Sequence, residues 1–188
     1  MKKRILMTLA VAALFVFVFA TITSAAVYYV DDEGNVSTEA TADTVYHFEP
    51  GGARTIDSNK CFRVGTIYLH DTSATKIVFP VASDVLSGYT GIAPQSGWGS
   101  SLYVYGVDSD GNVITKTVVT DNGDGTTTET QENISYATQI VEVEFLSGLD
   151  LDGASGKGAF SGFTSLTTLT VRGDVSTGGD AFTKGWIL

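Results

Sequence analysis

A short phrase near the end of the chain occurs twice, 22 residues apart: residues 159–166 read AFSGFTSL, and residues 181–188 read AFTKGWIL. Both copies begin with an alanine and a phenylalanine, carry a second aromatic residue, and end in leucine. Self-similarity at a period of about 20–29 residues is typical of solenoids, whose units bury their apolar face only against a neighbouring unit. The chain is therefore predicted to end in stacked repeats, which build a surface for contact and not a catalytic pocket.

Apolar residues between 140 and 188 recur in two sets with strand-like spacing. The sets are Val141, Val143 and Phe145, and then Leu166, Leu169 and Val171. A polar, glycine-containing stretch and an Ala-Phe pair follow each set. This pattern predicts one strand per unit, a turn, and a compact segment whose phenylalanine packs under the next strand.

The segment 158–171, GAFSGFTSLTTLTV, resembles the leucine-rich repeats of the BspA-like surface proteins. In that family an Ala-Phe pair, a small, aromatic or cysteine position, a leucine and a short strand recur about every 22 or 23 residues. The resemblance implies an exported or wall-associated adhesion or interaction protein, with no catalytic residues to transfer. The repeat core that it implies is Ala159, Phe160, Phe163, Leu166, Leu169, Val171, Ala181, Phe182, Trp186 and Leu188.

Residues 1–26 have the three parts of a secretory signal peptide: residues 2–4 are basic, residues 5–20 are apolar, and residues 24–26 are small. A membrane anchor is the alternative, because the apolar run approaches the ~20 residues that a span requires. We expect cleavage, since polar residues end the run. The mature chain would then begin at Val27, meet the membrane only transiently through its signal peptide, and be secreted or displayed at the cell surface.

The charge balance excludes several classes of partner. The chain has a net charge of −10, and without residues 1–26 it keeps 8 basic and 21 acidic residues, a net charge of −13. Nucleic acids require clustered lysine and arginine, and anionic membrane surfaces attract basic segments. We therefore expect no nucleic-acid partner, but an extracellular protein, a host or cell surface, or another copy of the chain.

The composition after residue 26 is that of a β protein, rich in threonine, valine and tyrosine, and no segment sustains the apolar spacing of an amphipathic helix. The fold class is therefore predicted to be all-β. An antiparallel β domain, a sandwich or a meander, is expected over residues 27–137, and a short solenoid segment of leucine-rich-repeat type over residues 138–188. Strand-like runs occupy residues 27–30, 44–48, 61–69 and 76–81.

A meander is the clearest local prediction. Residues 102–105 form its first strand, Asp108 to Gly111 turn the chain, and residues 113–120 run back. Residues 121–125, DNGDG, then turn again into a threonine-rich strand over 126–130. Asp-Gly and Asn-Gly between strand-like runs are strong hairpin signals, because both residues tolerate a positive φ.

The two aspartate-rich turns also raise the question of calcium. An EF-hand loop needs oxygen ligands at positions 1, 3 and 5, glycine at position 6 and glutamate at position 12. Placing Gly111 or Gly125 at position 6 leaves no glutamate at position 12. Hairpin turns are favoured and no metal site is predicted, although weak Ca²⁺ binding by Asp108, Asp110, Asp121 or Asp124 stays open.

Catalytic motifs are missing from the sequence. His47 and His70 are the only histidines and lack the spacing of a metal site, so packed or surface histidines are favoured. No Gly-x-Ser-x-Gly nucleophile motif occurs, and no carboxylate pair stands out for glycoside hydrolysis. Trp98, in the glycine-rich segment 96–100, can stack on a sugar ring, but a packing role is favoured. We therefore predict that the protein is not an enzyme and carries no cofactor.

Two further features concern modification. Cys61 is the only cysteine, which excludes a disulfide within one chain, and burial in a strand is favoured over pairing with a partner chain. Asn35-Val36-Ser37 and Asn133-Ile134-Ser135 are glycosylation sequons, so Asn35 and Asn133 are candidate acceptors.

Three functions follow from these patterns. The first is a secreted or cell-surface interaction or adhesion protein that acts by contact. The second is an extracellular structural subunit that assembles by pairing strands or repeats between chains. The third is a carbohydrate-binding or carbohydrate-active β protein.

Overall fold

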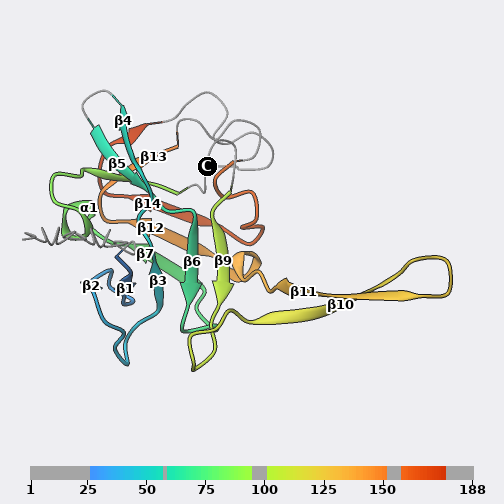
Figure 1. Ribbon diagram of the computed structural model, residues 1–188. Coiled ribbons are helices and arrows are strands. Elements are labelled where there is room, and N and C mark those ends of the chain that lie inside the picture. Colours follow the sequence, from blue (N-terminus) through green and yellow to red (C-terminus); the bar gives the residue numbers. More distant parts are fainter. Residues whose placement is uncertain (1–25, 57–58, 95–100, 152–157, 177–188) are drawn as a thin grey trace, which may run out of the picture.

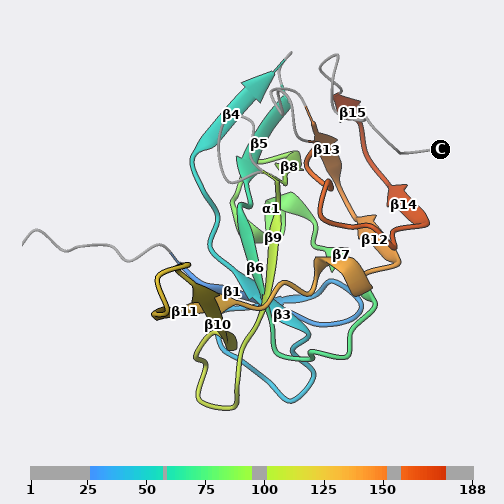
Figure 2. The same ribbon diagram turned by 90° about the vertical axis from the view of Figure 1, so that its right-hand side faces the viewer.

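The computed structural model describes residues 26–56, 59–94, 101–151 and 158–176, and the predicted signal peptide lies outside this part of the chain. Within it the chain is all-β, as predicted: besides strands it contains one helical turn, α1 (Ala82–Val85), and one 3₁₀ turn, η1 (Ala137–Gln139). Neither is long and apolar enough to cross a membrane. Figures 1 and 2 show three sheets packed together and one hairpin that projects from them.

The first sheet has one buried and one outward face. Its five strands are, in order across the sheet, β2 (Val36–Ser37), β1 (Tyr28–Val30), β3 (Tyr46–Phe48), β6 (Thr66–Leu69) and β9 (Tyr103–Gly106). Neighbours are antiparallel except β6 and β9, which are parallel. Burial alternates along β3, β6 and β9, because successive side chains of a strand point to opposite faces.

The other two sheets are built mainly from parallel strands. One contains β14 (Thr168–Val171), β12 (Glu142–Phe145) and β7 (Lys76–Phe79). The other contains β15 (Val175–Ser176), β13 (Gly148–Asp150), β8 (Gly91–Ala93), β5 (Asn59–Arg63) and β4 (Ala53–Ile56), of which β4 and β5 are antiparallel. The chain thus passes three times from the first of these sheets to the second, as β7–β8, β12–β13 and β14–β15.

One hydrophobic core joins all three sheets. The phenol hydroxyl of buried Tyr46 donates a hydrogen bond of 2.8 Å to the carbonyl oxygen of Val78. Phe79 stacks on Phe145 with 4.4 Å between ring centroids, and Phe145 meets Phe160 edge-on. Buried residues from both predicted segments, 27–137 and 138–188, therefore pack against each other in the same core.

The strand-like run 61–69 differs from its prediction as one strand. It breaks at Val64 and Gly65, with β5 in one sheet and β6 in another. The amide of Val64 donates to the carbonyl of Ala93, while the carbonyl of Gly65 accepts from Tyr103. Ala93 belongs to β8 and Tyr103 to β9, which lie in different sheets, so the chain passes from one sheet to the other at this point. Cys61, before the corner, is 4% exposed, as its strand context predicted.

The predicted hairpin is confirmed, and the predicted three-stranded meander is wrong. β10 (Thr115–Asp121) pairs with β11 (Thr127–Asn133) in antiparallel register, and Gly123 and Gly125 have positive φ in the turn. The strand before them, β9, forms its ladder with β6 and not with β10. It meets the hairpin only at the hairpin's base, through the isolated bridges Val107–Val113 and Tyr105–Ser135 and the hydrogen bond from the Ile114 amide to the Gly106 carbonyl, among the described residues. Because β9 pairs with β6 in the first sheet, the β10–β11 hairpin has no third strand beside it and projects away from the three packed sheets (Figure 1).

Candidate functional site: an aromatic sheet face and the groove beside it

A row of aromatic side chains crosses the outward face of the first sheet. Tyr29 on β1 pairs with His47 on β3, His47 pairs with Tyr68 on β6, and Tyr68 pairs with Tyr105 on β9. Residues in direct register share a face of the sheet, so the four rings lie side by side. With Tyr103 and His70, which lie two positions away on the same face, they form what we call the tyrosine face.

The rings of the tyrosine face contact one another and remain open to solvent. His47 stacks on Tyr68 at 4.9 Å between ring centroids, and Tyr103 stacks on Tyr105 at 5.9 Å. Tyr103 is 44% exposed, and the other members are half-buried. Tyrosine offers a rigid apolar ring with a polar tip, which suits it to contact surfaces.

The two histidines of this face form a hydrogen-bonded pair. The Nδ1 atom of His47 lies 2.8 Å from the Nε2 atom of His70. One nitrogen must donate and the other accept, so at least one imidazole is neutral. Burial, and then the neighbouring His70, lower the pKa of His47 to about 4, and burial also lowers the pKa of His70. Among the described residues neither ring bonds to a serine, cysteine or carboxylate, so no catalytic triad forms here.

The histidine pair makes stability depend on pH. His47 has a pKa of about 4 when folded and 6.5 as its ordinary value. Between pH 6.5 and pH 4, His47 binds a proton in the unfolded chain but not in the folded chain. The stability that is present above pH 6.5 is therefore lost as the pH falls toward 4. We expect a loss of roughly 1–2 kcal/mol between about pH 7.5 and pH 5, after allowance for solvent at the half-exposed ring. Urea unfolding at the two pH values measures it.

The matched control for this pH dependence is His47→Phe, which keeps an aromatic ring between Tyr29 and Tyr68. The variant should lose most of the difference in stability between the two pH values. Asp31 and Glu144, whose pKa values are lowered, ionise below this interval and do not contribute. An unchanged difference in the variant would assign the effect to other groups.

A polar groove opens next to the tyrosine face. Its volume is about 380 Å³, and its lining includes Glu49, Gly52, Arg63, Thr66 and Tyr68. The Nε atom of Arg63 is buried and has no hydrogen-bond partner among the described residues. A buried donor without an acceptor costs about 1–3 kcal/mol and requires an explanation. We refer to this cavity as the Arg63 groove.

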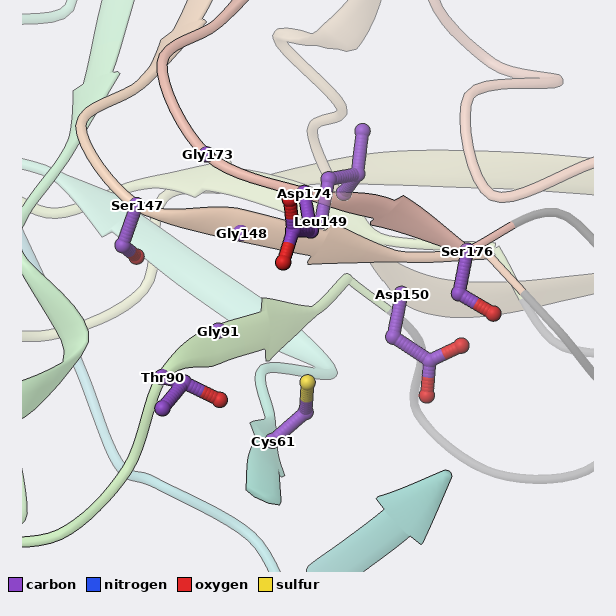
Figure 3. Close-up of a pocket in the computed structure, with 10 residues that line it drawn as sticks. All are labelled: Cys61, Thr90, Gly91, Ser147, Gly148, Leu149, Asp150, Gly173, Asp174 and Ser176. Atoms are coloured by element: carbon purple, nitrogen blue, oxygen red, sulfur yellow. The ribbon is translucent and has the colours of Figure 1, made fainter. Parts of the chain in front are cut away.

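A second cavity, of about 280 Å³, lies where β8, β13 and β15 meet Cys61. Figure 3 shows the side chains of Cys61 and Asp150 reaching into it from different strands. Gly91 and Gly148 stand at its wall, where the backbones of β8 and β13 approach closely: a Cβ on Gly91 would lie 2.8 Å from the carbonyl oxygen of Gly148. The close approach of β8 and β13 therefore forms one wall of this cavity, and no histidine accompanies its thiol within the described chain.

Of the ten predicted repeat-core residues, six lie in the described part of the chain, and these six differ in burial. Ala159, Phe160 and Phe163 are at most 2% exposed. The remaining described members, Leu166, Leu169 and Val171, are partly buried and pack against the same core. Ala181, Phe182, Trp186 and Leu188 lie outside the described residues, as does Trp98. The assignment of all ten to a repeat stays a prediction.

The acidic turns form hydrogen bonds of their own. Asp108 accepts from the amides of Asp110 and Asn112, and these bonds, Asn112 first, lower its pKa. Asp31 accepts in the same way from Glu33 and Asn35. The carboxylates of Asp31, Asp32 and Glu33 gather within 4.8 Å in that turn. Hydrogen bonds to the turn backbone account for this geometry, and the question of weak Ca²⁺ binding stays open.

Both sequon asparagines are exposed. Asn35 lies in the turn after β1, where its side-chain amide donates to Asp31 at 2.8 Å, and Asn133 ends β11. Both side chains are exposed, as an acceptor for glycosylation must be, and glycosylation at the two sites stays a prediction.

The tyrosine face was not predicted from the sequence. A signal was present: strands β3, β6 and β9 each carry a tyrosine or histidine between two apolar residues, in YHF, IYL and VYG. Alternation of this kind places the apolar residues inside and the aromatic residue outside. The pairing order of the strands, which aligns these residues in one row, is not visible in any local pattern.

Comparisons of the chain with protein-family models, with curated proteins and with solved structures give no match.

Proposed function

We propose that this protein is a secreted or cell-surface interaction protein that binds an extracellular protein or a cell surface by contact, through its tyrosine face. The observation that supports the proposal most strongly is the in-register row Tyr29–His47–Tyr68–Tyr105, half-open to solvent on a sheet whose other face is core. Aromatic residues are enriched at contact surfaces and dominate their binding energy. A rigid sheet also holds the rings in place before binding, which reduces the entropy lost on association.

The parallel strands add support for repeats of the BspA-like kind. We propose that β7–β8, β12–β13 and β14–β15 are three units of one solenoid. In each, a strand of the first parallel sheet is followed by a connection and a strand of the second; the connection is a short turn in β12–β13 and β14–β15, and it contains α1 in β7–β8. Stacking of such units buries apolar faces that no unit covers alone. In this proposal the solenoid is the scaffold that carries the tyrosine face.

The test is the double variant Tyr103→Ser/Tyr105→Ser. Both side chains lie on the outward face of β9, so the core should be undisturbed. We expect saturable binding of the mature chain to intact cells or to immobilised extracellular-matrix proteins, weakened about ten-fold or more in the variant because aromatic contacts carry most of an interface's energy. Biolayer interferometry and cell-binding isotherms measure it.

The matched control is Val119→Ser on the projecting hairpin, where the side chain is 57% exposed. Binding by this variant should equal that of the unmodified chain. Absence of saturable binding, or equal loss in both variants, contradicts the proposal. Sedimentation of the same samples tests the alternative of a self-assembling subunit: binding that appears only with a concentration-dependent rise in mass would favour assembly over contact by a single chain.

A further inference from the structure

We infer that the Arg63 groove and the adjoining edge of the tyrosine face form a binding site for a neutral glycan chain. The inference rests on the proposed function and names the chemistry that the contact surface recognises. Its starting point is the combination of aromatic rings on one sheet face with hydrogen-bond donors and acceptors in the groove beside it.

The rings supply one half of the site. Tyr103 pairs in register with Thr66, and Tyr68 lies two residues beyond Thr66 on the same strand and in the lining of the groove. The pyranose ring of a sugar presents an apolar face of C–H groups, which packs on an aromatic ring much as another ring would. Because neighbouring strands lie ~4.8 Å apart, the row from Tyr29 to Tyr105 extends about 14 Å, long enough for several consecutive sugar rings.

The groove supplies the other half. Sugar hydroxyls both donate and accept hydrogen bonds, and the groove offers a carboxylate acceptor in Glu49, a hydroxyl in Thr66 and a guanidinium donor in Arg63. The buried Nε of Arg63 has no acceptor within the described chain, so this one donor of the guanidinium is left unsatisfied there. A few polar groups that converge beside an aromatic ring, here that of Tyr68, in a cavity of about 380 Å³, can fix and orient a small ligand.

Charge selects a neutral ligand over an acidic one. The groove is lined by one acidic and one basic residue, Glu49 and Arg63, and the mature chain has a net charge of −13. A polyanionic glycan would be repelled by this field. A neutral chain avoids this repulsion, and its affinity should depend little on salt.

The structure offers a variant that fills the groove without strain. Gly52 lines the groove, and a Cβ placed there meets no atom within 4 Å. Gly52→Leu should therefore fold normally and occupy the space of the ligand. Tyr103→Ala removes an exposed ring, and Arg63→Gln removes the charged donor while retaining a side-chain amide. Thr117→Leu, on the exposed hairpin, is the control for an added apolar side chain.

The experiment titrates the mature chain, by isothermal calorimetry, with soluble β-1,3-glucan, β-1,4-glucan oligosaccharides, galactomannan and an α-glucan, and with heparin as the acidic glycan. We expect at least one neutral glycan to bind, with affinity about ten-fold lower for Tyr103→Ala and Gly52→Leu, lower for Arg63→Gln, and unchanged for Thr117→Leu. Thermal unfolding of each variant establishes that it is folded.

Three results would overturn the inference: no neutral glycan binds, heparin alone binds, or binding survives both Tyr103→Ala and Gly52→Leu. These failures are distinguishable from failure of the proposed function. If the chain binds cells or matrix proteins through Tyr103 and Tyr105, and neither Gly52→Leu nor an excess of soluble glycan changes that binding, the partner is a protein and only the glycan inference falls. If no surface is bound and no neutral glycan binds in the calorimeter, both fall.

Discussion

The variant Gly91→Val is expected to lose about 3 kcal/mol or more of its free energy of unfolding. Gly91 lies on β8 between β5 and β13, and a Cβ there would come within 2.8 Å of both the Sγ atom of Cys61 and the carbonyl oxygen of Gly148. The carbonyl belongs to the backbone of the neighbouring strand, so it cannot rotate away as a side-chain end would. Relief of the contact requires β8 and β13 to separate. Urea unfolding followed by circular dichroism measures the loss.

The control for this prediction is Gly52→Val, which introduces the same side chain where a Cβ meets nothing within 4 Å. Its stability should lie within about 0.5 kcal/mol of the unmodified chain. Equal losses in the two variants would point to a general cost of replacing glycine by valine, and not to the close approach of the two strands.

The second large effect is expected from Phe145→Ala, with a loss of about 3–5 kcal/mol. Phe145 is fully buried, stacks on Phe79 and meets Phe160 edge-on. Truncation removes the buried ring and leaves a cavity among neighbours that other strands hold in place. Denaturant midpoints, combined with the slope of the unfolding curve, give the value.

The shape of the same unfolding curves tests the shared core. Phe79 and Phe145 come from the two predicted segments and stack on each other, so both halves should unfold in one cooperative transition. Val119→Ala on the hairpin is the matched truncation outside the core and should change stability by less than about 0.5 kcal/mol. Two separate transitions, or a loss from Phe145→Ala no larger than that from Val119→Ala, would contradict the shared core.

The features that the sequence predicted correctly are those set by neighbouring residues. The β10–β11 hairpin follows from DNGDG, because Gly123 and Gly125 supply the positive φ that the turn needs. The all-β class follows from composition and from the lack of helical periodicity.

A second local repeat in the sequence was not used in these predictions. Residues 30–36, VDDEGNV, and residues 107–113, VDSDGNV, are nearly identical. In both turns an aspartate accepts from the amide of an asparagine four residues on.

The features that escaped prediction depend on residues far apart in the chain. The pairing of β6 with β9 is one of them, and it takes β9 out of the expected meander. The contact between His47 and His70 is another, since it requires β3 and β6 to be neighbours. The tyrosine face combines four strands, and the order of strands in a sheet is settled by the packing of the whole core, which no local pattern of residues specifies.

The order in which strands are synthesised gives the interleaved sheets a consequence for folding. β7 is made early, but its sheet partner β12 follows only after residues 80–141, and β8 likewise waits for β13. Until β12 and β13 have been synthesised, the growing chain contains strand edges with unpaired backbone N–H and C=O groups. Such edges can pair with strands of other chains and lead to aggregation. Pairings this distant also slow folding, because a long loop must close before the contact forms. A chain of this topology should therefore depend on protection from aggregation until residue 150 has been made.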